Sequence, residues 1–527
     1  MTVVIVGSGL AAVGSIRAAI ERGLRPIVLD IGLALPHELK SLKSKLAKTN
    51  PADWTEADWD AIRRNDSNRG RLIPRKLVLG SDYFYSSAEP KDERSGASED
   101  CSPPESGARG GFSVGWGAAV LPPAISDLKF WPITHQELIA NMRSVTHDLQ
   151  ISEPTDVLSQ YFGTIRDGDS TVLALNESQK KLLNVLIASC NDGAKEKFLV
   201  GQSRLLTDAR SGLNTSCRLC GMCSSGCVYD SIYTAERDID RWVAENKIDY
   251  RSGLEVTKVE EKNNCVTITY VVGEKTHCFE ADKVYLAAGA MSTTRIMVNS
   301  APLEIQKVRI RRTGGMILVY AGPRHYKINW PNTNTQTSHV VEMLSPDISP
   351  HWVHIQVGQP NELLLQRIGL SGIHDRKIIQ RMTKGLAAHL VTAVLNTNSE
   401  YGPQYELDAE RSRDGRVILH CRQSWTEENQ LILKKSTHRF SKFMKRSGFL
   451  RVPFASQDSL TATGFHLGSS FPMTLDPTSA LETDVLGRPF GWQRVYLVDT
   501  SVLPSIPSTG IGISVLANSY RIASETL

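Results

Sequence analysis

The chain has 527 residues, of which 41% are hydrophobic and 22% are charged, and its 60 basic and 56 acidic residues give a formal net charge of +4. This length accommodates two or three domains, or one large two-part fold with a full hydrophobic core. The balanced charge argues against nucleic acid as a partner, and no stretch reaches the roughly 18 apolar residues that a membrane helix needs. The N-terminus has no basic leader followed by a cleavage site, so we expect a soluble, cytoplasmic protein without a membrane segment.

The first expected element is a strand–turn–helix–strand unit at the N-terminus. Residues Val3 to Val6 form a short β-branched run, as a buried parallel strand does. Gly7, Gly9 and Ala12 then fill a G-x-G-x-x-G/A pattern, and the second strand ends on Asp30, where an acid binds a ribose hydroxyl. The pattern predicts a dinucleotide site and does not separate FAD from NAD. The alternative is a chance glycine turn in another α/β unit.

The next distinctive segment, residues 86–111, is polar and rich in Pro, Gly and Ser. We expect a loop here. Two roles stay open for it: a lid over a site or a disordered surface insertion.

Four cysteines follow one another within eleven residues, at Cys217, Cys220, Cys223 and Cys227. The spacing C-x2-C-x2-C-x3-C is that of ferredoxin loops around cubane clusters, although Val228 stands where ferredoxins have Pro. We therefore expect an iron–sulfur cluster, with [4Fe-4S] favoured over the [3Fe-4S] form that three ligands would hold. Zinc, which favours two separated pairs, a disulfide, and buried structural thiols are the alternatives. The other cysteines are scattered and are expected in the core or on the surface: Cys101, Cys190, Cys265, Cys278 and Cys421.

The C-terminal stretch 494–523 predicts a strand from Val495 to Val498, then Asp499, a Pro- and Gly-rich turn and a helix from about Ile513. This stretch resembles the C-terminal flavin signature of the glucose–methanol–choline (GMC) oxidoreductases. In that family the helix after the turn directs its N-terminus at the flavin.

Four further segments resemble GMC segments in the family's order. They are ARGGFSVGWGA (108–118, the second glycine motif), KFWPITHQEL (129–138), KVYLAAGAMSTTRIM (283–297) and GFHLGSSFPM (464–473, the segment of the catalytic histidine). The second of them is similar to the pyranose oxidase and gluconate dehydrogenase branch. The gluconate, fructose and glucose dehydrogenases also carry a cysteine-rich segment, which binds an iron–sulfur cluster that takes electrons from FAD.

The resemblance implies an α/β (α+β overall) fold with a discontinuous, Rossmann-like FAD-binding domain and a substrate domain. The FAD-binding domain is expected over 1–125, 211–300 and 456–527, and the cap and substrate regions over 126–210 and 301–455. Alternating segments in the latter suit an antiparallel sheet with one face toward a substrate cavity: 339–344, 351–357 and 416–423.

The resemblance also implies which residues hold FAD. They are Gly7, Gly9, Ala12, Asp30, Gly110, Gly111, Ser113, Gly115, Trp116, Ala288, Gly289, Asp499 and Gly510. Some relatives attach FAD covalently to a histidine in the second glycine motif. Because residues 114–116 contain none, we expect non-covalent FAD.

His466 stands where the family has its catalytic base, and a histidine has a suitable pKa for that role near neutrality. A hydrogen-bonded structural histidine is the alternative. The family's second His or Asn falls on Gly510, so the sequence departs from the pattern there. Thr509 is then the candidate for anchoring the substrate hydroxyl.

These features together predict an FAD-dependent dehydrogenase that oxidises an alcohol, with a sugar or polyol as the substrate class. Electrons would leave through the cluster to a ferredoxin-like or cytochrome acceptor. Two alternatives stay open: a redox-neutral epimerase or isomerase or a reductase run from a low-potential donor, and a non-catalytic electron-transfer or scaffold subunit. Trp330 and Trp352 suit either sugar stacking or the core.

Overall fold

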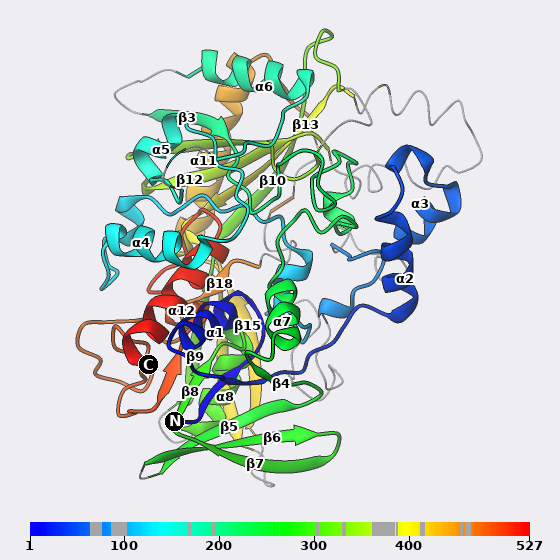
Figure 1. Cartoon of the computed structure of the whole chain (residues 1–527). Helices are drawn as coiled ribbons and strands as arrows, with labels where there is room; N and C mark the ends of the chain where they lie inside the picture. Colours follow the sequence, from blue (N-terminus) through cyan, green and yellow to red (C-terminus); the bar gives the residue numbers. More distant parts are fainter. Residues whose placement is uncertain are drawn as a thin grey trace.

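The structure is a computed structural model of the chain (Figure 1). It describes residues 1–63, 76–85, 103–166, 168, 170–190, 196–262, 264–301, 305–328, 334–360, 385, 388–411, 417–453, 457–458 and 465–527. The greater part of the predicted polar loop, 86–102, lies outside these residues together with Cys101, and so does Trp330.

A five-stranded parallel sheet is built from three distant parts of the chain. Its order is β19-β8-β1-β2-β4. The strands are β1 (Val3–Val6), β2 (Ile27–Leu29), β4 (Asp249–Arg251), β8 (Lys283–Leu286) and β19 (Val495–Leu497). Because β1 pairs with β8 on one side and with β2 on the other, the expected discontinuous Rossmann-like unit is confirmed.

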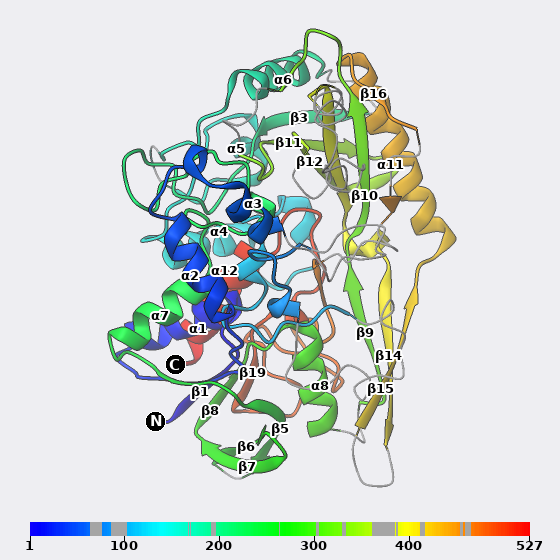
Figure 2. The same cartoon turned by 90° about the vertical axis from the view of Figure 1, so that its right-hand side faces the viewer.

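Two helices from opposite ends of the chain pack together beside this sheet, namely α1 (Leu10–Glu21) and α12 (Gly512–Thr526). Their contact requires small residues, since a Cβ on Gly14 would lie 2.4 Å from Leu516 O. Ser15 Oγ and Ser519 Oγ are hydrogen-bonded at 2.7 Å. Both ends of the chain therefore lie close together, as Figures 1 and 2 show.

A second, seven-stranded antiparallel sheet has the order β16-β10-β13-β12-β11-β3, with β17 also paired to β10. Its strands are β3 (Lys197–Gln202), β10 (Gly314–Ala321), β11 (His339–Ser345), β12 (Ser349–Gly358), β13 (Leu390–Thr397), β16 (Leu450–Arg451) and β17 (Gln457–Asp458). Helices α6 (Glu177–Ala188) and α11 (Glu427–Arg446) cover one face, where Val341, Val353 and Ile355 pack against them. Figure 2 shows α11 running along the outside of this sheet.

The substrate-domain sheet differs from the expectation in one strand. Segments 339–344 and 351–357 pair as β11 and β12, as expected. Segment 416–423, by contrast, contributes β15 to a separate four-stranded sheet of order β15-β14-β9-β18. The strands of that sheet are β9 (Lys307–Arg312), β14 (Gln404–Arg411), β15 (Val417–Ser424) and β18 (Leu467–Gly468). Alternation predicts a strand but not its partner, because partner choice depends on residues far away in the sequence.

The remaining strands are β5 (Glu255–Lys262), β6 (Cys265–Val272) and β7 (Lys275–Ala281), which form a three-stranded antiparallel sheet. The remaining helices are α2 (His37–Leu46), α3 (Glu56–Arg63), α4 (His135–Thr146), α5 (Val157–Phe162), α7 (Ala235–Ala244) and α8 (Ala290–Ser300). Short 3₁₀ segments are η1 (Pro51–Asp53), η3 (Tyr83–Tyr85), η5 (Gly111–Gly115), η6 (Ile125–Leu128), η7 (Cys223–Ser225), η9 (Ser399–Tyr401) and η10 (Thr500–Val502).

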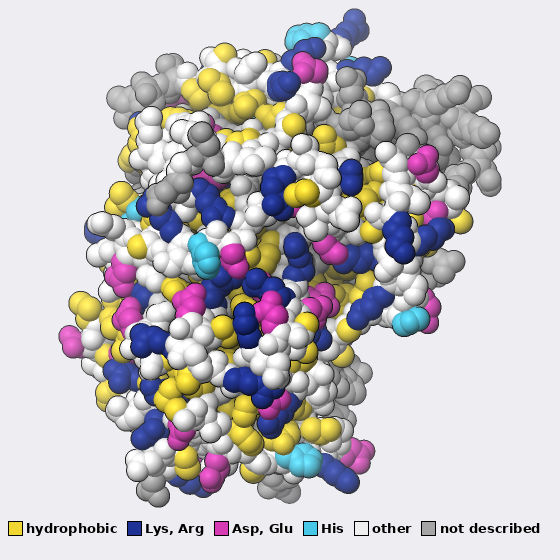
Figure 3. Space-filling model, viewed as in Figure 1, with side chains coloured by type: hydrophobic (Ala, Val, Ile, Leu, Met, Phe, Trp, Pro, Cys, Tyr) yellow, Lys and Arg dark blue, Asp and Glu magenta, His cyan; other side chains and the backbone are white. Residues whose placement is uncertain are grey.

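Basic and acidic side chains are interspersed over the face in Figure 3, in line with the small net charge. Within the described part of the chain, we find no helix with both the length and the apolar character needed to cross a bilayer. The predicted domain boundaries stay predictions.

Candidate functional site

A cavity of about 1100 Å³ lies at the carboxyl ends of the parallel strands. Its wall includes the turn after β1, the end of β2 at Asp30 and the turn after β8 at Gly289. The strand order reverses between β1 and β8, and ligands of open α/β sheets bind at such a switch point. The volume slightly exceeds the roughly 300–1,000 Å³ of common ligand pockets, which leaves room for a long ligand.

The first glycine turn forms one end of this cavity. Gly7 has φ +101°, and a Cβ there would lie 2.6 Å from Ala287 O, so only glycine fits. Gly9 is the N-cap of α1 and has no side chain to occupy the first N–H groups, and the first turn contains no acid. The helix N-terminus is therefore open to an anion. Ala12 is fully buried behind the wall, where it keeps the helix close to the sheet.

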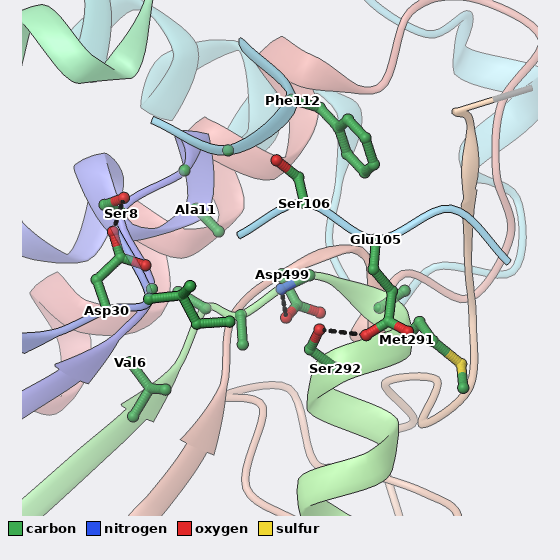
Figure 4. Close-up of a pocket in the computed structure, with 18 of the residues that line it drawn as sticks. Val6, Ser8, Ala11, Asp30, Glu105, Ser106, Phe112, Met291, Ser292 and Asp499 are labelled. Atoms are coloured by element: carbon green, nitrogen blue, oxygen red, sulfur yellow. Dashed lines mark hydrogen bonds between the residues drawn. The ribbon is translucent and has the colours of Figure 1, made fainter. Parts of the chain in front are cut away.

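Asp30 faces the same end of the cavity and is only 8% exposed. It accepts hydrogen bonds from Tyr250 Oη at 2.8 Å and from Ser8 Oγ (Figure 4). Burial raises the pKa of its carboxyl to about 6, against the lowering effect of these hydrogen bonds and of Arg109. The glycine pattern does not predict a role for Ser8, because Ser8 occupies a variable position of that pattern.

The second glycine motif lies directly against the first. A Cβ on Gly111 would come within 3.2 Å of Gly9 Cα, and Gly110 N–H donates to Ser8 Oγ at 2.9 Å. Ser113 Oγ donates to Gly110 O at 2.6 Å and accepts the N–H of Ala235, the first residue of α7, at 2.8 Å. Gly111 and Ser113 line the cavity, whereas Gly110 lies behind its wall.

Gly115 and Trp116 extend the wall toward α12. Phe84 packs on Gly115 so closely that a Cβ there would lie 2.7 Å from Phe84 Cζ. Trp116 Nε1 donates to Tyr233 O at 2.6 Å, which fixes the indole. A Cβ on Gly512 would lie 2.3 Å from the Trp116 ring, so the start of α12 and the indole form one surface.

The turn after β8 is tied to the C-terminal segment through Asp499. Gly289, with φ +87°, donates its N–H to Asp499 Oδ2 at 2.9 Å, and Thr293 Oγ1 donates to the same oxygen at 2.5 Å. Ser501 N–H donates to Oδ1 at 2.9 Å. Burial raises the pKa of the Asp499 carboxyl. Ala288, Gly289 and Asp499 all line the cavity.

The cavity wall beside Asp499 contains a charged group that the sequence did not reveal. Glu105 binds Arg295 through both carboxylate oxygens, at 2.8 and 2.9 Å, and accepts a hydrogen bond from Ser292 Oγ at 2.8 Å. All three residues line the cavity, and Figure 4 shows Glu105 and Ser292 beside Asp499. Only the tertiary structure brings positions 190 residues apart into this contact.

His466 lies in the cavity wall, just before β18. Its carbonyl oxygen accepts the N–H of Thr313 at 3.1 Å. Burial, and to a smaller extent the charge of His354, lower the pKa of the ring to about 4. The imidazole is therefore neutral around pH 7, which is the form a general base needs.

Thr509 and Gly510 do not line this cavity. Thr509 is fully buried, and its Oγ1 has no hydrogen-bond partner in the described part of the chain. A Cβ on Gly510 would lie 2.7 Å from Ala119 O, so this position has no space for a histidine or asparagine. The residues of this turn that reach the cavity are Ile511 and Gly512, and the anchoring role of Thr509 stays a prediction.

The four clustered cysteines share one half-buried loop around η7, outside the cavity wall. Gly226, with φ +95°, provides a turn at which a Cβ would lie 3.3 Å from Val78. Burial raises the pKa of the Cys217 thiol, and the charge of Cys227 raises it further. Among the described residues, no group of three or more His, Cys, Asp or Glu side chains is placed to hold a metal ion, and no cysteine is in a disulfide.

Hydrogen bonds connect this loop to the cavity. Asn334 Nδ2 donates to Cys217 Sγ at 3.5 Å and to Gln336 Oε1 at 3.0 Å. Gln336 Nε2 donates to Gly117 O at 2.8 Å, and Gly117 lines the cavity. The cysteine loop is thus linked to the site by two side chains.

No known family profile matches the sequence, and no curated protein does either. Solved structures do match the fold. Pyridoxine 4-oxidase from Mesorbium loti is 14% identical, with a TM-score of 0.61, and the match covers 99% of this chain and 98% of that one. An FAD-dependent oxidoreductase from Chaetomium thermophilum is 12% identical, with a TM-score of 0.58 and the same coverage. Over its full length, the chain has the fold of these two oxidoreductases.

Proposed function

We propose that the chain is an FAD-dependent oxidoreductase of the GMC type that oxidises a CH–OH group. One observation carries the proposal: a single cavity connects the glycine turns, Asp30 and Asp499 with His466. The two full-length structural neighbours support it, because one is an FAD-dependent oxidoreductase and the other acts on an alcohol-bearing compound, pyridoxine.

The residues of the cavity fit FAD. The N-termini of α1 and α12 both reach the wall, and neither has an acid in its first turn, so each suits an electron-rich group. Gly9 leaves the space that a pyrophosphate needs against the backbone, and Asp30 offers carboxylate oxygens to a ribose. His466 is the histidine among the described wall residues, and a role as base leaves it unattached, so we expect non-covalent FAD.

Bound FAD would supply the acceptor for the hydride that leaves the carbinol carbon. His466 would accept the hydroxyl proton on a ring nitrogen, so that the alcohol loses a proton and a hydride together and becomes a carbonyl compound. The neutral state of the ring follows from its burial. Phe112, Phe465 and Trp116 give the cavity an aromatic surface.

The substrate class that we propose is a sugar, a polyol or another small hydroxylated molecule. For Trp352, the sequence left open either stacking on a sugar ring or a place in the core. In the structure Trp352 is a core residue, packed edge-on against Phe162 with ring centroids 5.6 Å apart.

The proposal also includes the route by which electrons leave the flavin. A dehydrogenase with a one-electron protein acceptor, ferredoxin-like or a cytochrome, follows from the cysteine spacing. The link from Cys217 through Asn334 and Gln336 to the cavity supports a role beside the flavin. The described side chains are not arranged as a metal centre, however, so we derive no step through a cluster, which stays a prediction.

The test is anaerobic mixing of the purified protein with a panel of sugars, polyols and pyridoxine, followed by the flavin absorbance. We expect at least one alcohol to bleach the flavin. His466→Ala should slow bleaching by about 10²- to 10⁴-fold at unchanged flavin content, and the surface variant His420→Ala should behave as wild type. Bleaching that survives His466→Ala would refute the base, and no bleaching by any alcohol would favour the non-catalytic alternative.

A further inference from the structure

A second cavity, of about 490 Å³, lies outside the flavin cavity, on the four-stranded sheet. Strand β9 contributes Arg309 and Arg311 to its wall, and the rest of the wall comes from β14, the end of β15, η9, the start of α11 and the C-terminal turn. Neither arginine lines the flavin cavity. The volume is that of a common small-molecule site, and the flavin chemistry gives it no role.

The alternation along β9 places both arginines on one face of the sheet. Residues two apart on a strand share a face and lie roughly 6–7 Å apart along it. Val308 and Ile310 are buried in the core, whereas Arg309 is exposed and Arg311 is half-buried. The two arginine side chains therefore project side by side from the face away from the core, where both line the cavity.

The acid opposite Arg309 is bound by other groups. Arg309 is opposite Glu406 of β14, and Glu406 is opposite Arg422 of β15 (Figure 2). Glu406 forms an ion pair with Arg422 at 2.6 Å. It also accepts hydrogen bonds from Ser424 Oγ at 2.9 Å and from Gln404 Nε2 at 3.1 Å. Both carboxylate oxygens of Glu406 are thus occupied by groups other than Arg309.

Among the described wall residues, Glu400 of η9 is the one acid. Its Oε2 lies 3.0 Å from Nε2 of His351, whose Nδ1 lies 3.1 Å from Oδ1 of the buried Asp127. Burial lowers the pKa of His351, but the hydrogen bonds to the two carboxylates outweigh it and raise this pKa to about 9. The ring is therefore charged at neutral pH. The three groups together keep one negative charge, which faces two guanidinium groups.

The two arginines have no protein acceptor of their own. Neither guanidinium forms a hydrogen bond or an ion pair with another described residue. Burial and the charge of Arg309 lower the pKa of Arg311, and the charge of Glu400 offsets part of this effect. Two like charges are thus held close together with incomplete compensation. A cavity that presents such donors suits an anion.

A phosphate group fits these donors. A guanidinium presents a planar fork of N–H donors that matches the oxygens of phosphate and carboxylate. A carboxylate has two oxygens, which one fork fills. A phosphate or a phosphate monoester has at least three terminal oxygens, so it accepts hydrogen bonds from both forks at once.

The cavity is attached to segments that also shape the flavin cavity. Ser399 N–H donates to Ile506 O at 3.0 Å, and Ile506 N–H donates to Ser399 Oγ at 2.8 Å, which fixes η9 to the C-terminal turn. Arg311 is opposite Gly468 of β18, two residues after His466. A ligand of the arginines therefore binds beside the supports of the flavin cavity without entering it.

We propose that Arg309 and Arg311 form a binding site for a phosphate group, either free phosphate or the phosphate of a small monoester. The site does not depend on the flavin chemistry and would serve a non-catalytic protein equally. A ligand that bridges the two guanidinium groups should stabilise the folded chain, because it binds the folded state alone.

The test is thermal unfolding of the FAD-saturated protein at constant ionic strength, since bound FAD occupies the helix N-termini of the flavin cavity. The probes are inorganic phosphate, glucose 6-phosphate, glucose and acetate. We expect a saturable rise of the melting temperature with the two phosphates and none with glucose or acetate. Tighter binding of glucose 6-phosphate would identify a monoester as the ligand, and tighter binding of inorganic phosphate would identify the free ion.

Two variants assign the effect to the arginines. Arg309→Gln changes an exposed residue, so the variant should fold, and the midpoint concentration of phosphate should rise at least about tenfold. Arg311→Lys keeps the charge but loses the planar fork, and it should also weaken binding.

The matched control is Lys307→Gln. Lys307 lies on the same strand and the same face, carries the same charge and is 82% exposed, outside the wall of this cavity. It should keep the wild-type midpoint. Equal weakening in Lys307→Gln and Arg309→Gln would show diffuse attraction by surface charge and overturn the site. A phosphate effect that is unchanged in both arginine variants, no saturable effect in wild type, or tighter binding of acetate than of phosphate would overturn it as well.

Discussion

Asp499 and Gly289, 210 residues apart, are joined by a hydrogen bond of 2.9 Å from the glycine N–H to the carboxylate Oδ2. This bond fixes the turn after β8 against the segment after β19, and both residues line the cavity. The site thus depends on one carboxylate that binds two separate parts of the chain.

Asp499→Ala should therefore weaken flavin binding and the fold together. It leaves the donors of Gly289, Thr293 and Ser501 buried without an acceptor, at about 1–3 kcal/mol each. We expect at least about tenfold weaker FAD retention and a lower melting temperature. The control is Asp484→Ala, since Asp484 accepts two backbone N–H groups at 2.9 Å outside the cavity wall. Equal flavin loss in both variants would show that Asp499 acts through stability alone.

The contact between the two glycine motifs predicts a second result. Gly111→Ala would place a Cβ 3.2 Å from Gly9 Cα and strain a residue with φ +57°. Gly23→Ala suffers the same kind of strain, at φ +72°, with nothing within 4 Å of the added atom. Both variants should lose about 1 kcal/mol of unfolding free energy from strain. Only Gly111→Ala should also bind FAD more weakly, as measured by fluorescence titration of the apoprotein.

The raised pKa of Asp30, about 6, predicts how the stability of the apoprotein depends on pH. In the unfolded chain the pKa of this carboxyl is near 3.8. Between that pKa and the folded-state pKa of about 6, the folded protein therefore binds more protons at Asp30 than the unfolded chain does. This contribution to the unfolding free energy is fully present below about pH 4 and is lost as the pH rises through about 6, with an upper limit of ~3 kcal/mol. Urea titrations of apoprotein should show this fall, and Asp30→Asn should reduce it. A wild-type-like fall in Asp30→Asn would assign it to another group.

The cysteine loop gives a compositional prediction. Protein purified without oxygen should contain close to four irons and four sulfides per chain if the loop binds a cubane cluster. Cys217→Ser should then lose iron at unchanged flavin content, while the exposed Cys278→Ser should keep it. A clean flavin spectrum without iron would refute the cluster and leave a structural role for the four thiols.

Local patterns predicted the parts of the site that are local in the chain. Gly7, Gly9 and Asp30 follow from a strand and a turn whose geometry is encoded within thirty residues. The partners of β15 could not be predicted, because they depend on a register between strands that the sequence does not specify. Counting along the C-terminal turn could not show that Gly510 lies outside the cavity wall, where Ala119 O occupies the adjacent volume.

The order of the parallel sheet bears on how the protein is made. β19 and α12 follow β8 and α1 by hundreds of residues, yet they pack beside them, so the cavity lacks one wall until β19 and α12 have been synthesised. The first βαβ unit leaves the ribosome hundreds of residues before β19 does, at a synthesis rate of about 5–20 residues per second. A nascent chain that stops before β19 leaves one edge of β8 unpaired and one side of α1 uncovered, and such exposed edges and surfaces favour aggregation and chaperone binding.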